Sequence, residues 1–124
     1  MTEDLLERKE GRVAILTMNR PDRLNAMSGA MLDAMIEALS RLATDPDTGC
    51  VILTGAGRGF CAGGDVKSMA EGTEFPDAGM EGKAQQLRAK MESSRMLHEM
   101  PKPTIAMVRG PAAGAGLSLA LACD

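Results

Sequence analysis

The sequence has no tryptophan, no tyrosine and only two phenylalanines among its 124 residues, so its core has to be built from aliphatic and methionine side chains. It also lacks any apolar run near the ~20 residues that cross a bilayer, and it opens on acidic residues instead of a basic and apolar signal peptide. We therefore expect no membrane partner. Lys and Arg number 14 against 17 Asp and Glu, and the net charge of −3 argues against a nucleic-acid partner.

Cysteine and histidine, which build disulfide frameworks and metal sites, are scarce. Cys50, Cys61 and Cys123 are odd in number and form no CxxC pair, and His98 is the only histidine. This pattern predicts reduced thiols, a cytoplasmic location and no bound metal. We expect Cys61 to be a small buried filler and His98 to be a packed or helix-terminal residue instead of a catalytic one.

The hydrophobic fraction of 44% is typical of a globular chain, and its periodicity predicts strands and helices in alternation. The expected order is a hairpin over 5–18, a helix from the N-cap Ser28 to about Asp45, a buried strand over 50–54, a long helix over 80–99, a second buried strand over 104–108 and a helix over 117–122. A strand, a glycine-rich loop and a helix occur twice, which predicts an α/β fold with parallel strands and crossover helices. The last helix is apolar on every side with no later element to cover it. Either partner chains bury this helix or the chain is the front part of a longer protein, and we favour the second explanation.

Two glycine-rich loops, over 55–65 and 110–116, each follow one of the buried strands. Ligands of α/β proteins bind at the carboxyl ends of strands, and glycine lets a backbone N–H approach a ligand closely. Two converging N–H groups would form an oxyanion hole; the alternative is a pair of tight turns with a packing role only. Nucleotide binding is disfavoured, because Phe60 and Leu119 stand where GxGxxG needs its third glycine and no Gly-Lys-Ser/Thr triplet exists.

Several short motifs follow one another along the chain. They are Asn19-Arg20-Pro21 with Asn25-Ala26, then GFCAGGDV over 59–66, KPTIA over 102–106, GxxxGAG over 110–116 and ACD over 122–124. In this order and spacing they resemble the enoyl-CoA hydratase/isomerase (crotonase) family. The resemblance implies a crotonase-like spiral of repeated strand–strand–helix turns, apparently truncated, in which residues 1–124 are the N-terminal part of a single domain.

The resemblance further implies an acyl-CoA enzyme that stabilises a thioester enolate with two backbone N–H groups. By motif, these catalytic donors fall on Gly64 and Ala115. Coenzyme A is expected as part of the substrate, with no separate cofactor. Its predicted contacts are Arg23, Leu24, Asn25, Ala26, Ala62, Gly64, Asp65, Val66 and Lys67. Because family members commonly form trimers and pairs of trimers, we expect a homo-oligomer.

Ser118 departs from the family pattern. Hydratases of the family carry a glutamate one helical turn after the second donor, and a hydroxyl without an adjacent base cannot activate water near neutral pH. Isomerisation or another enolate reaction is therefore favoured over hydration, with a carboxylate expected beyond Asp124. A non-catalytic acyl-CoA-binding or interaction protein is the alternative, because the chain shows the donors without a catalytic carboxylate.

Overall fold

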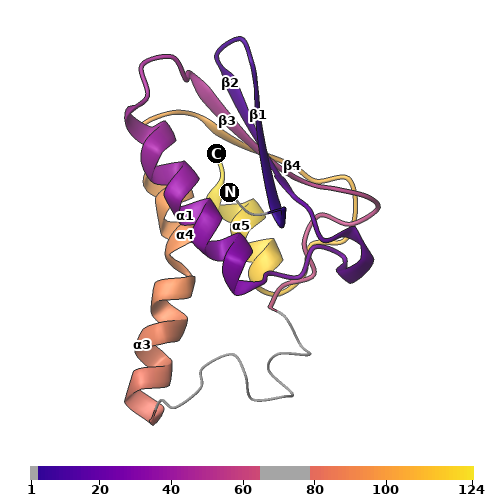
Figure 1. The fold of residues 1–124 in the computed structure, drawn as a ribbon, viewed down its shortest axis with the longest axis vertical. Coiled ribbons are helices and arrows are strands. Elements are labelled where there is room, and N and C mark those ends of the chain that lie inside the picture. Colours follow the sequence, from indigo (N-terminus) through magenta and orange to yellow (C-terminus); the bar gives the residue numbers. More distant parts are fainter. Residues whose placement is uncertain (1–2, 65–78) are drawn as a thin grey trace.

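The computed structural model describes residues 3–64 and 79–124, and its centre is a four-stranded sheet (Figure 1). The strands lie in the order β1-β2-β3-β4. They are β1 (Leu5–Glu10), β2 (Val13–Met18), β3 (Cys50–Gly55) and β4 (Thr104–Met107). β1 and β2 form an antiparallel hairpin, whereas β2, β3 and β4 run parallel to one another. The predicted α/β class with parallel pairing is confirmed.

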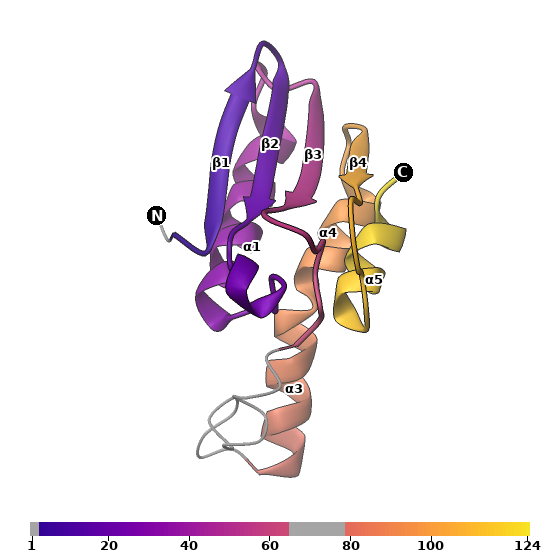
Figure 2. The same cartoon turned by 90° about the vertical axis from the view of Figure 1, so that its right-hand side faces the viewer.

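Helices cover one face of this sheet and leave the other face open (Figure 2). They are the short 3-10 helix η1 (Pro21–Arg23) and the α-helices α1 (Gly29–Thr44), α3 (Met80–Lys90), α4 (Glu92–Glu99) and α5 (Ala115–Ala122). Helices α1, α4 and α5 lie together along the covered face, and α3 projects beyond it (Figures 1 and 2). No helix of the described residues is long and apolar enough to cross a membrane.

Helix α1 supplies more of the described core than any other element. The hydroxyl of Ser28 caps the helix by accepting a hydrogen bond of 3.0 Å from the Met31 amide, as the sequence predicts. Asp45 follows as the C-cap, so the predicted end of the helix is confirmed. The buried residues of α1 recur at helical spacing and face the inward side chains of the strands. They are Met31, Leu32, Met35, Ala38, Leu39 and Leu42.

The single long helix predicted over 80–99 is wrong, because the structure breaks it at Met91. This residue ends α3 and starts α4 with φ −88° and ψ 5°, outside the helical range. None of the residues of α3 is buried, whereas α4 buries Ser93 and Leu97 against the core. Only the second segment is therefore fixed by packing against the core, and an Arg88–Glu92 ion pair of 2.9 Å bridges the break.

The prediction that β4 is buried on both faces is also wrong for the described residues. β4 pairs only with β3, and Ile105 and Met107 on its helix-free face are 49% and 41% exposed. The last helix begins at Ala115, two positions earlier than expected, and it is not buried all round. Leu119 is buried, but Leu121 is 75% exposed.

Candidate functional site

Three loops meet at one edge of the sheet, where β2, β3 and β4 end. Because these strands are parallel, their carboxyl ends point the same way (Figure 2). The loops following them are joined by two isolated bridges, between Met27 and Gly64 and between Cys61 and Ala112. The structure thus brings together segments that are more than 80 residues apart, from Leu24 to Ala115. This is the edge at which α/β proteins bind ligands.

The two glycine-rich loops pack backbone against backbone. The Cys61 amide donates to the Pro111 carbonyl at 3.1 Å, and the Ala113 amide donates to the Cys61 carbonyl at 3.0 Å. A Cβ on Gly63, whose φ is +107°, would lie 3.0 Å from the Ala113 oxygen and 3.5 Å from the Ala115 nitrogen. Only glycine permits this combination of a positive φ and a close approach. The loop after β3 therefore runs directly beside the start of α5.

The two predicted catalytic donors, Gly64 and Ala115, lie on these adjacent segments, and both are half-buried. Ala115 is the first residue of α5, where an N–H has no partner inside the helix. Within residues 3–64 and 79–124, neither amide donates a backbone hydrogen bond. The positive end of the α5 dipole acts in the same place. Such an arrangement can stabilise negative charge on a ligand oxygen.

Around the loop after β2, the predicted coenzyme A contacts divide into exposed and buried residues. Arg23 at the end of η1 and Ala62 beside the second loop are exposed, and Leu24 is half-buried. Ala26 is 9% exposed, and Asn25 has no exposed surface at all. The structure therefore gives these two side chains a role in shaping the loop. Asp65, Val66 and Lys67 lie outside the described residues.

Asn25 has a role that the sequence reasoning missed. Its side-chain oxygen accepts a hydrogen bond of 2.8 Å from the Arg20 amide, and its side-chain nitrogen donates to the carbonyls of Ala56 and Gly59, each at 2.9 Å. The side chain thus ties the loop after β2 to the loop after β3. An asparagine within a proline-containing turn is the available signal, because asparagine tolerates positive φ and hydrogen-bonds nearby backbone.

Cys61 is buried, as expected for a filler, and it also makes a hydrogen bond. Its thiol donates to the Asn25 carbonyl at 3.2 Å, and burial raises the pKa of the thiol. Ser118 lies one turn after Ala115, is exposed, and donates from its hydroxyl to the Gly114 carbonyl at 3.4 Å. His98 is exposed in the last turn of α4, so the prediction of a helix-terminal histidine is confirmed.

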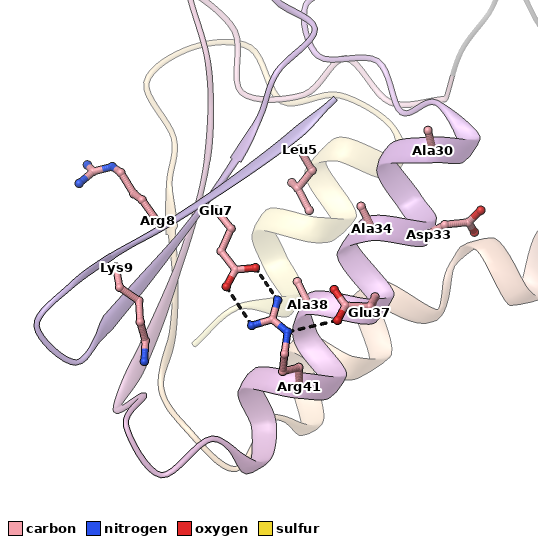
Figure 3. Close-up of a pocket in the computed structure, with 10 residues that line it drawn as sticks. All are labelled: Leu5, Glu7, Arg8, Lys9, Ala30, Asp33, Ala34, Glu37, Ala38 and Arg41. Atoms are coloured by element: carbon pink, nitrogen blue, oxygen red, sulfur yellow. Dashed lines mark hydrogen bonds and ion pairs between the residues drawn. The ribbon is translucent and has the colours of Figure 1, made fainter. Parts of the chain in front are cut away.

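A separate groove of about 800 Å³ lies between β1 and α1 (Figure 3). It is lined by Leu5, Glu7, Arg8, Lys9, Ala30, Asp33, Ala34, Glu37, Ala38 and Arg41. The Arg41 guanidinium bridges Glu7 and Glu37 across it, and these hydrogen bonds hold the pKa of Arg41 above its usual value. None of the predicted site residues that the structure describes lines this groove, so it is distinct from the site at the strand ends.

A sheet with three parallel strands, covered by helices on one face, defines the α/β class of protein. The sequence pattern of the enoyl-CoA hydratase/isomerase family matches residues 8–124. The chain therefore belongs to the enoyl-CoA hydratase/isomerase family, and the predicted membership is confirmed.

Known members of the family agree with this assignment. The chain is 41% identical over 126 residues to the 1,2-epoxyphenylacetyl-CoA isomerase of Escherichia coli, covering 100% of this chain and 47% of that protein. It is 40% identical over 124 residues to the enoyl-CoA hydratase EchA19 of Mycobacterium tuberculosis, covering 98% and 44%. Thus the chain spans about half the length of the curated relatives it matches.

Solved structures confirm the crotonase-like fold. The crystal structure of an enoyl-CoA hydratase/isomerase from Xanthobacter autotrophicus superimposes with a TM-score of 0.91 at 35% identity. The match covers 100% of this chain and 45% of that one. A crotonase-family structure from Legionella pneumophila superimposes with a TM-score of 0.88 at 32% identity, again over 100% of this chain and 47% of the other.

Proposed function

We propose that the protein binds acyl-CoA thioesters and stabilises their enolates with the N–H groups of Gly64 and Ala115. One observation carries the proposal. The amides of Gly64 and Ala115, on adjacent loops, donate to no carbonyl of the described residues, and Ala115 is the first residue of α5. Membership of the enoyl-CoA hydratase/isomerase family supports the acyl-CoA substrate class.

In the proposed reaction, a base removes a proton from a carbon conjugated with the thioester, and the electron pair moves onto the carbonyl oxygen. The two N–H donors and the α5 dipole then face a full negative charge, so they stabilise the transition state more than the bound thioester. Removal of one such donor typically costs about 2.7–4 kcal/mol. Return of the proton to another carbon completes an isomerisation. We propose that a carboxylate outside residues 1–124 moves the proton, as the family resemblance implies.

Within this scheme we favour isomerisation or another enolate reaction over hydration. Hydration needs a base that activates water, and the Ser118 hydroxyl is engaged with a backbone carbonyl instead of with a base. The name of the Escherichia coli relative, a 1,2-epoxyphenylacetyl-CoA isomerase, supports this choice. The family resemblance also supports a cytoplasmic homo-oligomer, a trimer or hexamer, that uses no cofactor other than the coenzyme A of its substrate.

The experiment that tests the proposal compares two ligands that differ in one oxygen. Butyryl-CoA carries the thioester carbonyl, and S-butyl-CoA is the matching thioether without it. We expect calorimetry on the whole protein to give tighter binding of butyryl-CoA, by about tenfold or more, since each of the two hydrogen bonds to a neutral carbonyl contributes about 0.5–1.5 kcal/mol. Equal affinities would remove the oxyanion assignment, and an absence of binding by either ligand would remove the substrate class.

Two variants test how much of the difference in affinity between butyryl-CoA and S-butyl-CoA comes from the Ala115 N–H. Proline is tolerated at the first position of a helix but has no N–H, so Ala115→Pro deletes the α5 donor alone. Met80→Pro makes the same change at the first position of α3, where the side chain is 87% exposed. We expect Ala115→Pro to reduce the preference for butyryl-CoA, because the Gly64 N–H remains, and Met80→Pro to keep it in full. A non-catalytic binder would show the same preference without turnover.

A further inference from the structure

We infer that Asn25 is a positioning residue that sets the direction of the Gly64 N–H; the inference rests on the proposed role of that N–H. The first observation is the backbone of the loop after β2. Leu24 and Asn25 are consecutive residues with positive φ, at 50° and 59°. Each non-glycine residue in this conformation costs about 1 kcal/mol, and the conformation persists only where its surroundings hold it.

The second observation is that the Asn25 side chain holds the loop after β2 in this conformation. Its amide is fully buried, and all three of its hydrogen bonds go to backbone: the Arg20 amide and the carbonyls of Ala56 and Gly59. It is also tightly enclosed, since a Cβ on Gly55 would lie 2.7 Å from its nitrogen. A buried amide bonded in this way has one orientation, because any rotation leaves a buried polar atom without a partner.

The third observation links this amide to the donor. Every residue between Phe60 and Gly64 is bonded to the backbone that flanks Asn25. The Cys61 thiol donates to the Asn25 carbonyl at 3.2 Å, the Ala62 amide donates to the Leu24 carbonyl at 2.9 Å, and the Met27 amide donates to the Gly63 carbonyl at 2.8 Å. A shift of the loop after β2 therefore also moves Gly64, the residue whose N–H is the proposed donor.

Asn25→Asp is the most specific test, because aspartate has the shape of asparagine but carries an acceptor oxygen in place of the donor nitrogen. In Asn25→Asp, an oxygen replaces the nitrogen that donates to Ala56 and Gly59, so two hydrogen bonds become contacts between acceptors. The matched control is Asn19→Asp. Asn19 lies on the same loop, and its side-chain nitrogen donates to the Glu3 carbonyl at 2.9 Å, away from the loop after β3.

A second variant, Asn25→Gly, allows the inference to be tested if Asn25→Asp does not fold. Asn25→Gly keeps the positive φ accessible, because glycine adopts it without strain, and it removes the side-chain anchor. Circular dichroism and thermal melting first establish which variants are folded. If Asn25→Asp and Asn25→Gly both fail to fold while the control folds, the side chain is a requirement for folding and the positioning role is overturned.

The readout is the infrared stretch of the carbonyl in butyryl-CoA labelled with carbon-13, bound to the whole protein. A hydrogen-bonded, polarised carbonyl absorbs at lower frequency than the same thioester in buffer. We expect the unmodified protein and Asn19→Asp to show the full lowering and the two Asn25 variants to lose at least half of it. The preference for butyryl-CoA over S-butyl-CoA should fall about tenfold in the Asn25 variants, which corresponds to about 1.4 kcal/mol.

The outcomes separate this inference from the proposed function. If the unmodified protein shows no lowering of the carbonyl frequency, the oxyanion proposal fails, and the positioning role fails with it. If the unmodified protein shows the lowering and folded Asn25 variants keep it in full, the proposed function stands and the positioning role is overturned. A loss of affinity for free CoA equal to the loss for butyryl-CoA would also overturn it, because free CoA lacks the thioester carbonyl that the Gly64 N–H is proposed to bind.

Discussion

Gly116 lies against the carbonyl group of Cys61 so closely that a Cβ on Gly116 would be 2.2 Å from the Cys61 oxygen. The first turn of α5 thus rests on the backbone of the loop after β3, with no side chain between them. The same Cys61 carbonyl accepts the Ala113 amide, so the two loops are both bonded and in contact. This contact sets the separation of the two proposed donors.

Gly116→Ala is expected to push α5 away from that loop. The added Cβ meets backbone atoms, which cannot rotate aside, so we expect a loss of at least about 1–3 kcal/mol in the free energy of unfolding, measured by urea denaturation. Gly79→Ala is the matched control, because a Cβ there has nothing within 4 Å. An equal, small effect of the two substitutions would show that the loops are not held in this contact.

Ser118 is expected to contribute little to turnover in the whole protein. Its hydroxyl is exposed and bonded only to the Gly114 carbonyl among the described residues, so Ser118→Ala should change kcat by less than about tenfold, or ~1.4 kcal/mol. Ser118→Glu would place a carboxylate one turn after Ala115 and should introduce slow hydration of a short 2-enoyl-CoA. A protein that hydrates such a substrate efficiently and loses the activity in Ser118→Ala would contradict the preference for an enolate reaction without hydration.

The fold could be predicted from the sequence where local signals agree with packing. The cap at Ser28 and the regular apolar spacing behind it gave α1 its bounds, and the two apolar strands gave the parallel pairs. The break at Met91 could not be predicted, because each half of 80–99 has helix-compatible residues and only tertiary contacts distinguish them. The prediction that β4 is buried on both faces was wrong for a similar reason. The apolar content of a strand does not indicate whether it pairs with one neighbouring strand or with two.

For the site, the sequence located the glycine loops but not the interactions that hold them. Motifs indicated Gly64 and Ala115, and the structure places them on adjacent segments. The motifs do not indicate that Asn25 is fully buried or that its side chain joins two loops. These contacts depend on positive φ at Leu24 and Asn25, which single-residue propensities do not specify.

Exposed apolar side chains on β4 and α5 lead to a prediction about association. Ile105, Met107 and Leu121 are among them, with Leu121 75% exposed. Because exposed apolar surface drives association, the 124-residue chain on its own should self-associate at micromolar concentrations in sedimentation experiments. Leu121→Lys should weaken that association more than Met80→Lys, which changes a residue 87% exposed on α3. A monomer at every concentration would contradict the prediction.

The central claim, that the Gly64 and Ala115 amides address a thioester oxygen, is tested most directly by amide hydrogen exchange on the whole protein. Exchange at the two residues is compared in the presence of saturating butyryl-CoA and of saturating free CoA, with Met80, an 87% exposed residue at the first position of α3, as an internal reference. The account predicts that butyryl-CoA slows exchange at both donors more than free CoA does, and that Met80 exchanges equally in both. Equal protection of Gly64 and Ala115 by the two ligands would contradict the oxyanion assignment and leave only a cleft that binds coenzyme A.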